Sequence, residues 1–238
     1  MVIKWPAIRE YTMTPIYKTA YPYYSDKKKI AKEVISTDYR LTPQEIQDIK
    51  DRMPDHMDSQ LCYAVLLMVF KNLNYFPEPN EIPPEIIEYI KDQLRIYDAD
   101  FNTCHPSTVT RHRKKIYKYY GVTSWKTSQP SDNNETFSPA QDFAKKIALE
   151  ASSMHNYPAD IINIVLEKLK KENFEFPTFK QLDRLAREAR AMMNQSIFDA
   201  TYGTLTDNQM SQLDLLLETN EEYQRSEFNS QDLRKTKF

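Results

Sequence analysis

The segment from Ser107 to Gly121 carries the residue types best suited to contact nucleic acid. If it forms a helix, Val109, Ile116 and Tyr120 share one narrow apolar face, because spacings of seven and four residues return to the same side. The opposite face carries four cations, Arg111, Lys114, Lys115 and Lys118. No acidic residue occurs in 109–126 to neutralise them. The pattern predicts a recognition helix that lies against DNA.

His112 and Arg113 add two further donors to this segment. Arg113 lies about 40° from the apolar face on a helical wheel, so we expect it to flank the core. His112 stands between two arginines and is a candidate donor to a base edge or a phosphate. Exposed basic helices often only solvate a protein, so a helix without a DNA role stays open as an alternative.

A second basic helix is predicted from Thr178 to about Ala200. One of its faces is apolar and carries Leu182, Leu185, Ala189 and Met193. The opposite face carries three predicted DNA-contacting residues, Lys180, Arg184 and Arg187. Asp183 and Glu188 flank this basic face and weaken it. Two basic helices, each closing a small helical module, favour tandem nucleic-acid binding.

Residues for catalysis or metal binding show no recognisable spacing. The histidines, which are His56, His105, His112 and His155, form no H-E-x-x-H motif. Cys62 and Cys104 lack a neighbouring base, the spacing of a metal motif and the number needed for a disulfide framework. The carboxylates of the Asp48 to Asp55 stretch offer too few donors for a hard cation. We predict no catalytic residue, no metal and no cofactor.

The composition argues against several classes of protein. A net charge of −2 disfavours a DNA-coating protein of high pI, since the basic residues are segregated rather than abundant. The presence of 2 glycines against 14 prolines disfavours a glycine-rich phosphate loop and favours helices joined at proline-containing corners. The longest apolar run, Leu61 to Phe70, is too short to cross a bilayer. We therefore expect a cytoplasmic protein with no membrane partner.

Helix-start signals are clearest at Leu41-Thr42-Pro43-Gln44-Glu45, where a threonine N-cap, a first-turn proline and a capping-box glutamate coincide. Prolines also open the helices expected at Pro83–Pro84, at Pro106 and at Pro139. The first basic helix then closes a four-helix module, which is the order of helix-turn-helix domains. The sequence predicts an all-α fold of tandem small helical modules with helix-turn-helix-like recognition helices.

The composition also suggests where these modules begin and end. We predict an N-terminal arm at 1–40, a first DNA-binding module at 41–125, a linker at 126–137, a second DNA-binding module at 138–203, and an acidic helix and tail at 204–238. The tyrosine-rich arm is expected to pack on the following module through Trp5 and its tyrosines. Alternatively, its basic residues Lys27 to Lys29 and Lys32 would follow DNA phosphates.

Several short motifs follow one another along the chain: Leu41-Thr42-Pro43-Gln44-Glu45, Tyr75-Phe76-Pro77, Ile82-Pro83, Tyr89 to Leu94, Arg111-His112-Arg113 with Ile116 and Gly121, and Pro177-Thr178 with Leu182, Arg184 and Leu185. In this order they resemble the N-terminal region of the Tn-three family of replicative transposases. The similarity covers roughly 41–217 and depends on the order of the motifs. Arg95 departs from it, because the family often has glycine at that position.

The resemblance implies two tandem helical modules that bind the terminal inverted repeats of a transposon, ahead of a separate catalytic region. Its expected partners are double-stranded DNA and either the remainder of the transposase or a second protomer. Two alternatives remain open on the residues themselves. One is a helix-turn-helix regulator that binds a palindromic operator as a dimer, and the other is a helical protein-interaction module without a DNA role.

Overall fold

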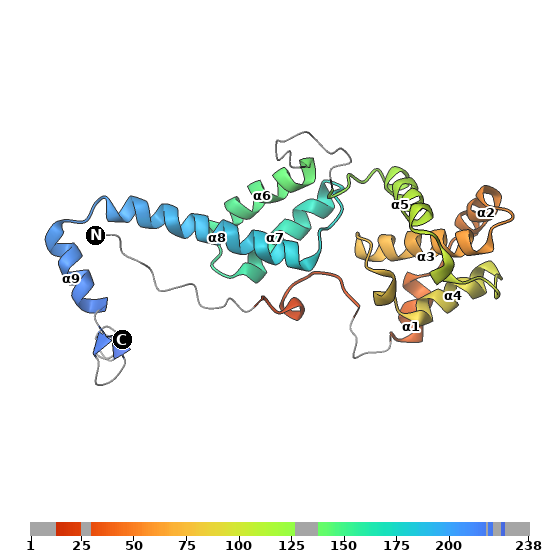
Figure 1. Ribbon diagram of the computed structural model, residues 1–238, viewed down its shortest axis with the longest axis horizontal. Helices are drawn as coiled ribbons and strands as arrows, with labels where there is room; N and C mark the ends of the chain where they lie inside the picture. Colours follow the sequence, from red (N-terminus) through yellow and green to blue (C-terminus); the bar gives the residue numbers. More distant parts are fainter. Residues whose placement is uncertain (1–12, 25–29, 127–137, 218, 221–224, 227–238) are drawn as a thin grey trace. The chain divides into compact units, whose positions relative to one another are not determined.

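The computed structural model describes residues 13–24, 30–126, 138–217, 219–220 and 225–226. Contacts within the chain divide it into two units, Met1–Arg190 and Ala191–Phe238, with the boundary inside helix α8 (Phe179–Tyr202). The described residues are mainly helical, and their only strands are β1 (Thr219–Asn220) and β2 (Arg225–Ser226), which pair antiparallel. The predicted all-α fold class is confirmed (Figure 1).

The helices of the first unit follow one another with short connections. They are α1 (Lys32–Asp38), α2 (Pro43–Arg52), α3 (Met57–Leu73), α4 (Pro84–Leu94), α5 (Pro106–Tyr120), α6 (Pro139–Ser152), α7 (Pro158–Lys171) and the first part of α8. Three 3-10 turns lie between or before them, η1 (Ile16–Lys18), η2 (Pro79–Glu81) and η3 (Phe101–Thr103). The second unit holds the end of α8, α9 (Asp207–Leu217) and the two strands.

The predicted helix starts are confirmed by their capping groups. Thr42 Oγ1 accepts the backbone N–H of Glu45 at 3.1 Å, and the Glu45 carboxylate accepts the Thr42 N–H at 2.7 Å. Proline occupies the first turn of α2, α4, α5, α6 and α7. Proline has no N–H to leave unpaired there, and its fixed φ matches the helix. Local chemistry therefore determines where these helices begin.

The first hydrophobic core surrounds α3. Every residue from Gln60 to Phe70 is buried, so α3 is covered on all sides rather than along one stripe. Helices α2, α4 and α5 pack against it, contributing Ile49, Ile90 and Ile116. Because α3 is enclosed on all sides, the packing of α5 against it holds the basic helix in a defined position.

A second core forms where α6, α7 and α8 meet. Four alanines of α6, Ala140, Ala144, Ala148 and Ala151, are buried at the contact with α7. Small side chains at helical spacing allow the two helices to approach closely. The larger side chains that fill this core come mainly from α7, as with Ile161 and Leu169.

The described part of the N-terminal arm contacts both cores. Helix α1 packs against α4 in the first. Tyr21, however, is buried in the second core, and its hydroxyl donates to the carbonyl of Pro177 at 2.9 Å. The arm therefore packs on the following module, where Tyr24 and Tyr39 contact the first core, and also reaches the second core. Trp5 and Lys27 to Lys29 lie outside the described residues, as does nearly all of the predicted linker.

Arg95 ends α4 in the left-handed conformation, with φ 59° and ψ 45°. This position usually belongs to glycine, because a side chain there crowds the backbone. The Arg95 side chain is exposed, so it gains no buried contact in return. The departure from glycine noted in the sequence thus carries a local conformational cost.

Replacing Arg95 with glycine is expected to raise the free energy of unfolding by about 0.5–1 kcal/mol. The left-handed conformation costs a non-glycine residue about 1–2 kcal/mol, and the greater freedom of glycine in the unfolded chain offsets part of that gain. Urea unfolding would measure the change. Glu88→Gly, inside the same helix, is the control and should lower stability by about 1 kcal/mol. Destabilisation by both substitutions would contradict the assignment.

Candidate nucleic-acid interface

The basic helix α5 is defined by local signals at both ends. The His105 ring accepts the backbone N–H of Ser107, Pro106 occupies the first turn, and Gly121 closes the helix with φ 63°. Ile116 is fully buried against α3, while Val109 and Tyr120 pack at the edge of the same core. The predicted apolar face of this helix is therefore confirmed, and its outer face is left to solvent.

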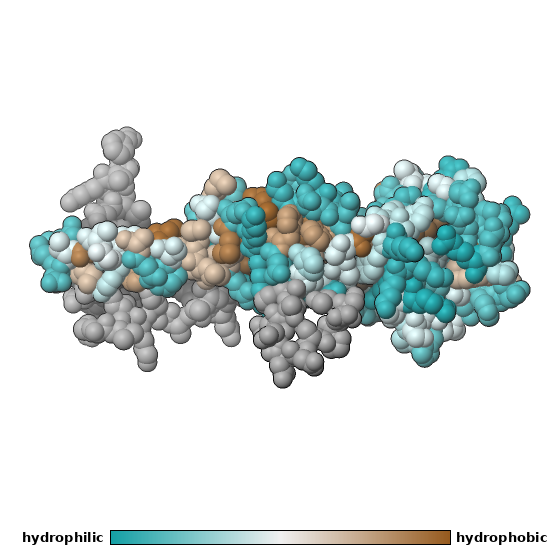
Figure 2. Space-filling model, turned by 90° about the horizontal axis from the view of Figure 1, so that it is seen from above, coloured by the Kyte–Doolittle hydropathy of each residue, from teal (hydrophilic) through white to brown (hydrophobic). Residues whose placement is uncertain are grey.

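The outer face of α5 is cationic and open. Arg111, Lys114, Lys115 and Lys118 are exposed and, with Ser107 and Thr110, line a shallow hollow of about 440 Å³. None of these four cations forms an ion pair with any residue that the structure describes. In Figure 2 the surface over the part of the chain that carries α5, at the right, is largely hydrophilic. Such a face can accept an anionic polymer without first breaking internal salt bridges.

His112 points away from this face. Its side chain is only 1% exposed, its Nε2 lies 3.0 Å from Ser59 Oγ, and its ring packs edge-on against Tyr63. Burial lowers its pKa to about 4, with Lys115 and Arg111 adding to the effect, so the ring is neutral at pH 7. A side chain enclosed in the core cannot reach a base edge, and the predicted DNA contact by His112 is corrected. Its spacing from Val109 and Ile116, three and four residues, already indicated the apolar face.

Arg113 flanks the core as predicted. Its guanidinium carbon lies 5.1 Å from the centre of the Phe76 ring, a cation–π arrangement that holds the side chain beside α5. The side chain is partly buried, and its Nε has no hydrogen-bond partner among the described residues. Arg113 is thus a restrained cation next to the exposed ones.

The three cations predicted on the second basic helix, α8, have different surroundings. Lys180 is exposed and unpaired within the described part of the chain. Arg184 forms an exposed ion pair with Glu188 at 3.6 Å. Arg187 instead donates to the buried Asp183 at 2.9 Å and to Thr14 Oγ1 at 3.2 Å, while Asp183 accepts the Thr14 N–H at 3.1 Å. Arg187 therefore connects the N-terminal segment to α8 through Thr14 and Asp183, and its predicted contact with DNA stays a prediction.

Arg187→Ala is expected mainly to lower stability, whereas Arg184→Ala is expected mainly to weaken DNA binding. Loss of Arg187 leaves the buried Asp183 without its charged partner and should lower stability by about 1–3 kcal/mol. Loss of Arg184 removes an exposed pair worth about 0–1 kcal/mol but also removes a candidate phosphate contact. Thermal unfolding and DNA titration of both variants measure the two effects. Equal stability of the two variants would contradict the structural role of Arg187.

Glu175 is a positioning residue that the sequence did not indicate. Its carboxylate accepts the Tyr117 hydroxyl at 2.7 Å, the Ser124 hydroxyl at 3.0 Å and the Trp125 N–H at 2.8 Å. Burial raises the pKa of Tyr117, and the nearby Glu175 charge raises it further, so the hydroxyl remains a donor. These bonds tie the last turn of α5 to the segment that follows it.

Comparison with known proteins gives two findings. A family model described as "Domain of unknown function (DUF4158)" matches residues 18–189, which is most of the chain. The chain is also similar to "Transposase for transposon Tn1546" from Enterococcus faecium, with 22% identity over 185 residues. That alignment covers 76% of this chain but only 17% of the transposase.

No helix among the described residues is long and apolar enough to cross a membrane.

The family match includes both basic helices up to residue 189, and it extends N-terminally to η1. It therefore spans both hydrophobic cores. The chain belongs to the DUF4158 family and is a transposase-related protein.

Proposed function

We propose that this chain is the DNA-recognition part of a transposase and binds the terminal inverted repeats of its transposon. The observation that carries the proposal is the outer face of α5, where Arg111, Lys114, Lys115 and Lys118 are exposed together without acidic partners among the described residues. The similarity to a transposase supports the choice of a transposon end as the target.

The contacts divide by chemistry. Lys114, Lys115 and Lys118 suit phosphates, because an ammonium group is a point charge without a fixed geometry for bases. Arg111 is the candidate reader of guanine, since a guanidinium can donate two bonds to its O6 and N7. Arg113, which is held beside Phe76, adds a further positive charge next to these residues.

A second set of contacts on α8 comes from Lys180 and Arg184. The Glu188 carboxylate competes for Arg184, so this surface contributes less than α5. Together the two helices would cover a longer site than either one alone. In this proposal the chain recognises DNA and leaves strand chemistry to the remainder of the transposase or to a second protomer.

Fluorescence anisotropy tests the proposal. The purified chain is titrated into a labelled duplex carrying the terminal repeat and into a scrambled duplex of equal length, over a series of salt concentrations. Specific recognition predicts binding to the repeat tighter by about 10³-fold or more, with affinity falling as salt rises. Equal, weak binding to both duplexes would reduce α5 to a nonspecific cationic surface.

The mass of the complex separates a transposon-end binder from an operator-binding regulator. A transposase end predicts one chain on each asymmetric repeat, whereas a helix-turn-helix regulator predicts two chains on a palindromic site. If the chain binds no DNA even at low salt, both DNA-binding functions are wrong, and a protein-interaction module becomes the remaining hypothesis.

A further inference from the structure

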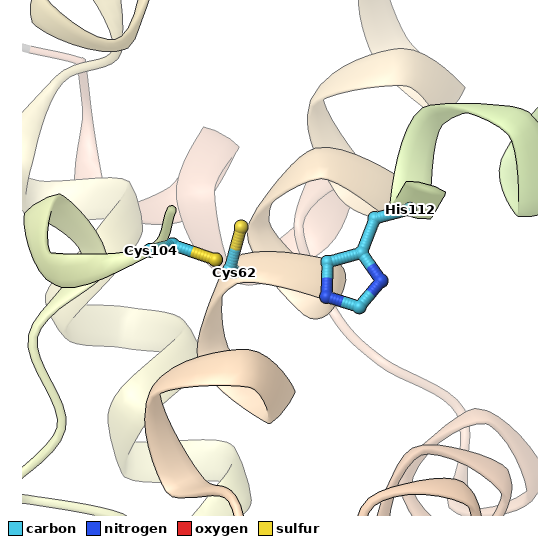
Figure 3. Close-up of side chains that lie close together, drawn as sticks. All are labelled: Cys62, Cys104 and His112. Atoms are coloured by element: carbon cyan, nitrogen blue, oxygen red, sulfur yellow. The ribbon is translucent and has the colours of Figure 1, made fainter. Parts of the chain in front are cut away.

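Three potential metal ligands meet beneath α5. Cys62 comes from α3, Cys104 from the turn between η3 and α5, and His112 from α5 itself. Their sulfur atoms and one ring nitrogen all lie within 4.8 Å of one another (Figure 3). Cys62 and His112 are buried, Cys104 is partly exposed, and neither cysteine forms a disulfide in the structure.

We propose that Cys62, Cys104 and His112 bind one zinc-class divalent cation. Two thiolates and one imidazole form a ligand set that Zn²⁺ prefers. Two thiolates also balance the charge of a divalent ion, which lowers the cost of holding it in a buried site. The fourth position falls to a water molecule, which has access from the partly exposed Cys104 side.

The observed distances are compatible with an ion after a small contraction. Zn–S bonds of about 2.3 Å in a tetrahedron place ligand atoms about 3.8 Å apart. The present separations of at most 4.8 Å therefore need to close by about 1 Å, which rotation of the side chains can supply.

The orientation of the His112 ring determines which of its nitrogens would bind the ion. In Figure 3 the ring nitrogen on the side of the two thiols is Nε2, which also lies 3.0 Å from Ser59 Oγ. Coordination therefore takes place through Nε2 and replaces its bond to Ser59, while the buried Nδ1 stays on the far side of the ring. Ser59 in turn lies 3.2 Å from Met53 Sδ.

Binding of the ion balances in atoms and charge. One cation is taken up, two metal–sulfur bonds and one metal–nitrogen bond form, and the two thiol protons are released. The ion would join α5 to α3, because His112 lies in the second turn of α5, Cys104 lies in the turn that precedes α5, and Cys62 belongs to α3.

Loading of the purified, reduced full chain with Co²⁺ and Zn²⁺ tests the proposal. We expect one equivalent of either ion per chain by equilibrium dialysis, and Co²⁺ should give the visible and near-ultraviolet bands of a tetrahedral thiolate site. Zn²⁺ should also raise the melting temperature. Cys104→Ser, which changes a partly exposed residue, and His112→Gln should each weaken binding by at least about tenfold.

His105→Gln is the matched control, because His105 is an exposed histidine next to Cys104. It should bind one equivalent like the unchanged chain. Binding of less than one equivalent, a cobalt spectrum without thiolate bands, or equal binding by Cys104→Ser would each overturn the proposal. None of these readouts uses DNA, so the metal site and the DNA-binding function are tested separately.

Discussion

Charge reversal of Lys114 and Lys115 should abolish tight binding to the terminal repeat. Each lost charge-assisted contact costs about 1.5–3 kcal/mol, so the double variant Lys114→Glu/Lys115→Glu is expected to bind about 10²-fold more weakly or worse. The slope of affinity against salt should become shallower by about two contacts. Anisotropy at several salt concentrations measures both quantities. Both side chains are exposed, so helicity and melting temperature should remain close to those of the unchanged chain.

The matched control reverses two exposed lysines of α7, Lys168 and Lys170, and changes the net charge of the chain by the same amount. If bulk charge alone attracts DNA, both double variants lose affinity equally. If the outer face of α5 is the interface, the α7 variant retains most of its affinity. An unchanged affinity of the α5 variant would remove this face from consideration.

Ile116→Ala should destabilise the first unit by about 2–5 kcal/mol. Ile116 is fully buried between α5 and α3, and shortening it removes apolar contacts and leaves a cavity. The loss should also loosen the attachment of the basic helix, so affinity for DNA falls with stability. Urea unfolding gives the free energy, and DNA titration below the transition gives the affinity.

The same chemical change at Ile197 serves as the control. Ile197 is 53% exposed, and Ile197→Ala should change stability by no more than about 0.5 kcal/mol. A cost below about 1 kcal/mol at Ile116 would mean that α5 is not anchored through this residue.

Features determined by nearby residues were predictable from the sequence. The capping box of Thr42 and Glu45, the proline at the start of α5 and its end at Gly121 all depend on residues within one helical turn. The exposed cations of α5 followed from helical periodicity. His112 was assigned to the wrong face because its polar ring outweighed a spacing that indicated the core.

Features that depend on distant segments were not predictable. Arg187 lies on the polar side of α8, but its partner Thr14 is 173 residues away in the sequence. Glu175 has no distinguishing neighbour in sequence, and its three donors come from another segment. Cys62 and Cys104 match no short metal motif, because only the packing of α5 on α3 brings them to His112.

The hydrogen bond between Ser138 Oγ and the carbonyl of Trp125, 2.7 Å long, joins the two ends of the segment 126–137. Because this bond holds Trp125 and Ser138 together, the number of residues between them does not determine where these two residues lie. Lengthening the chain between two such fixed residues costs only the entropy of closure, about 0.6 kcal/mol for each doubling. A peptide tag or a fluorescent label inserted there should therefore leave both cores and the cationic face of α5 intact.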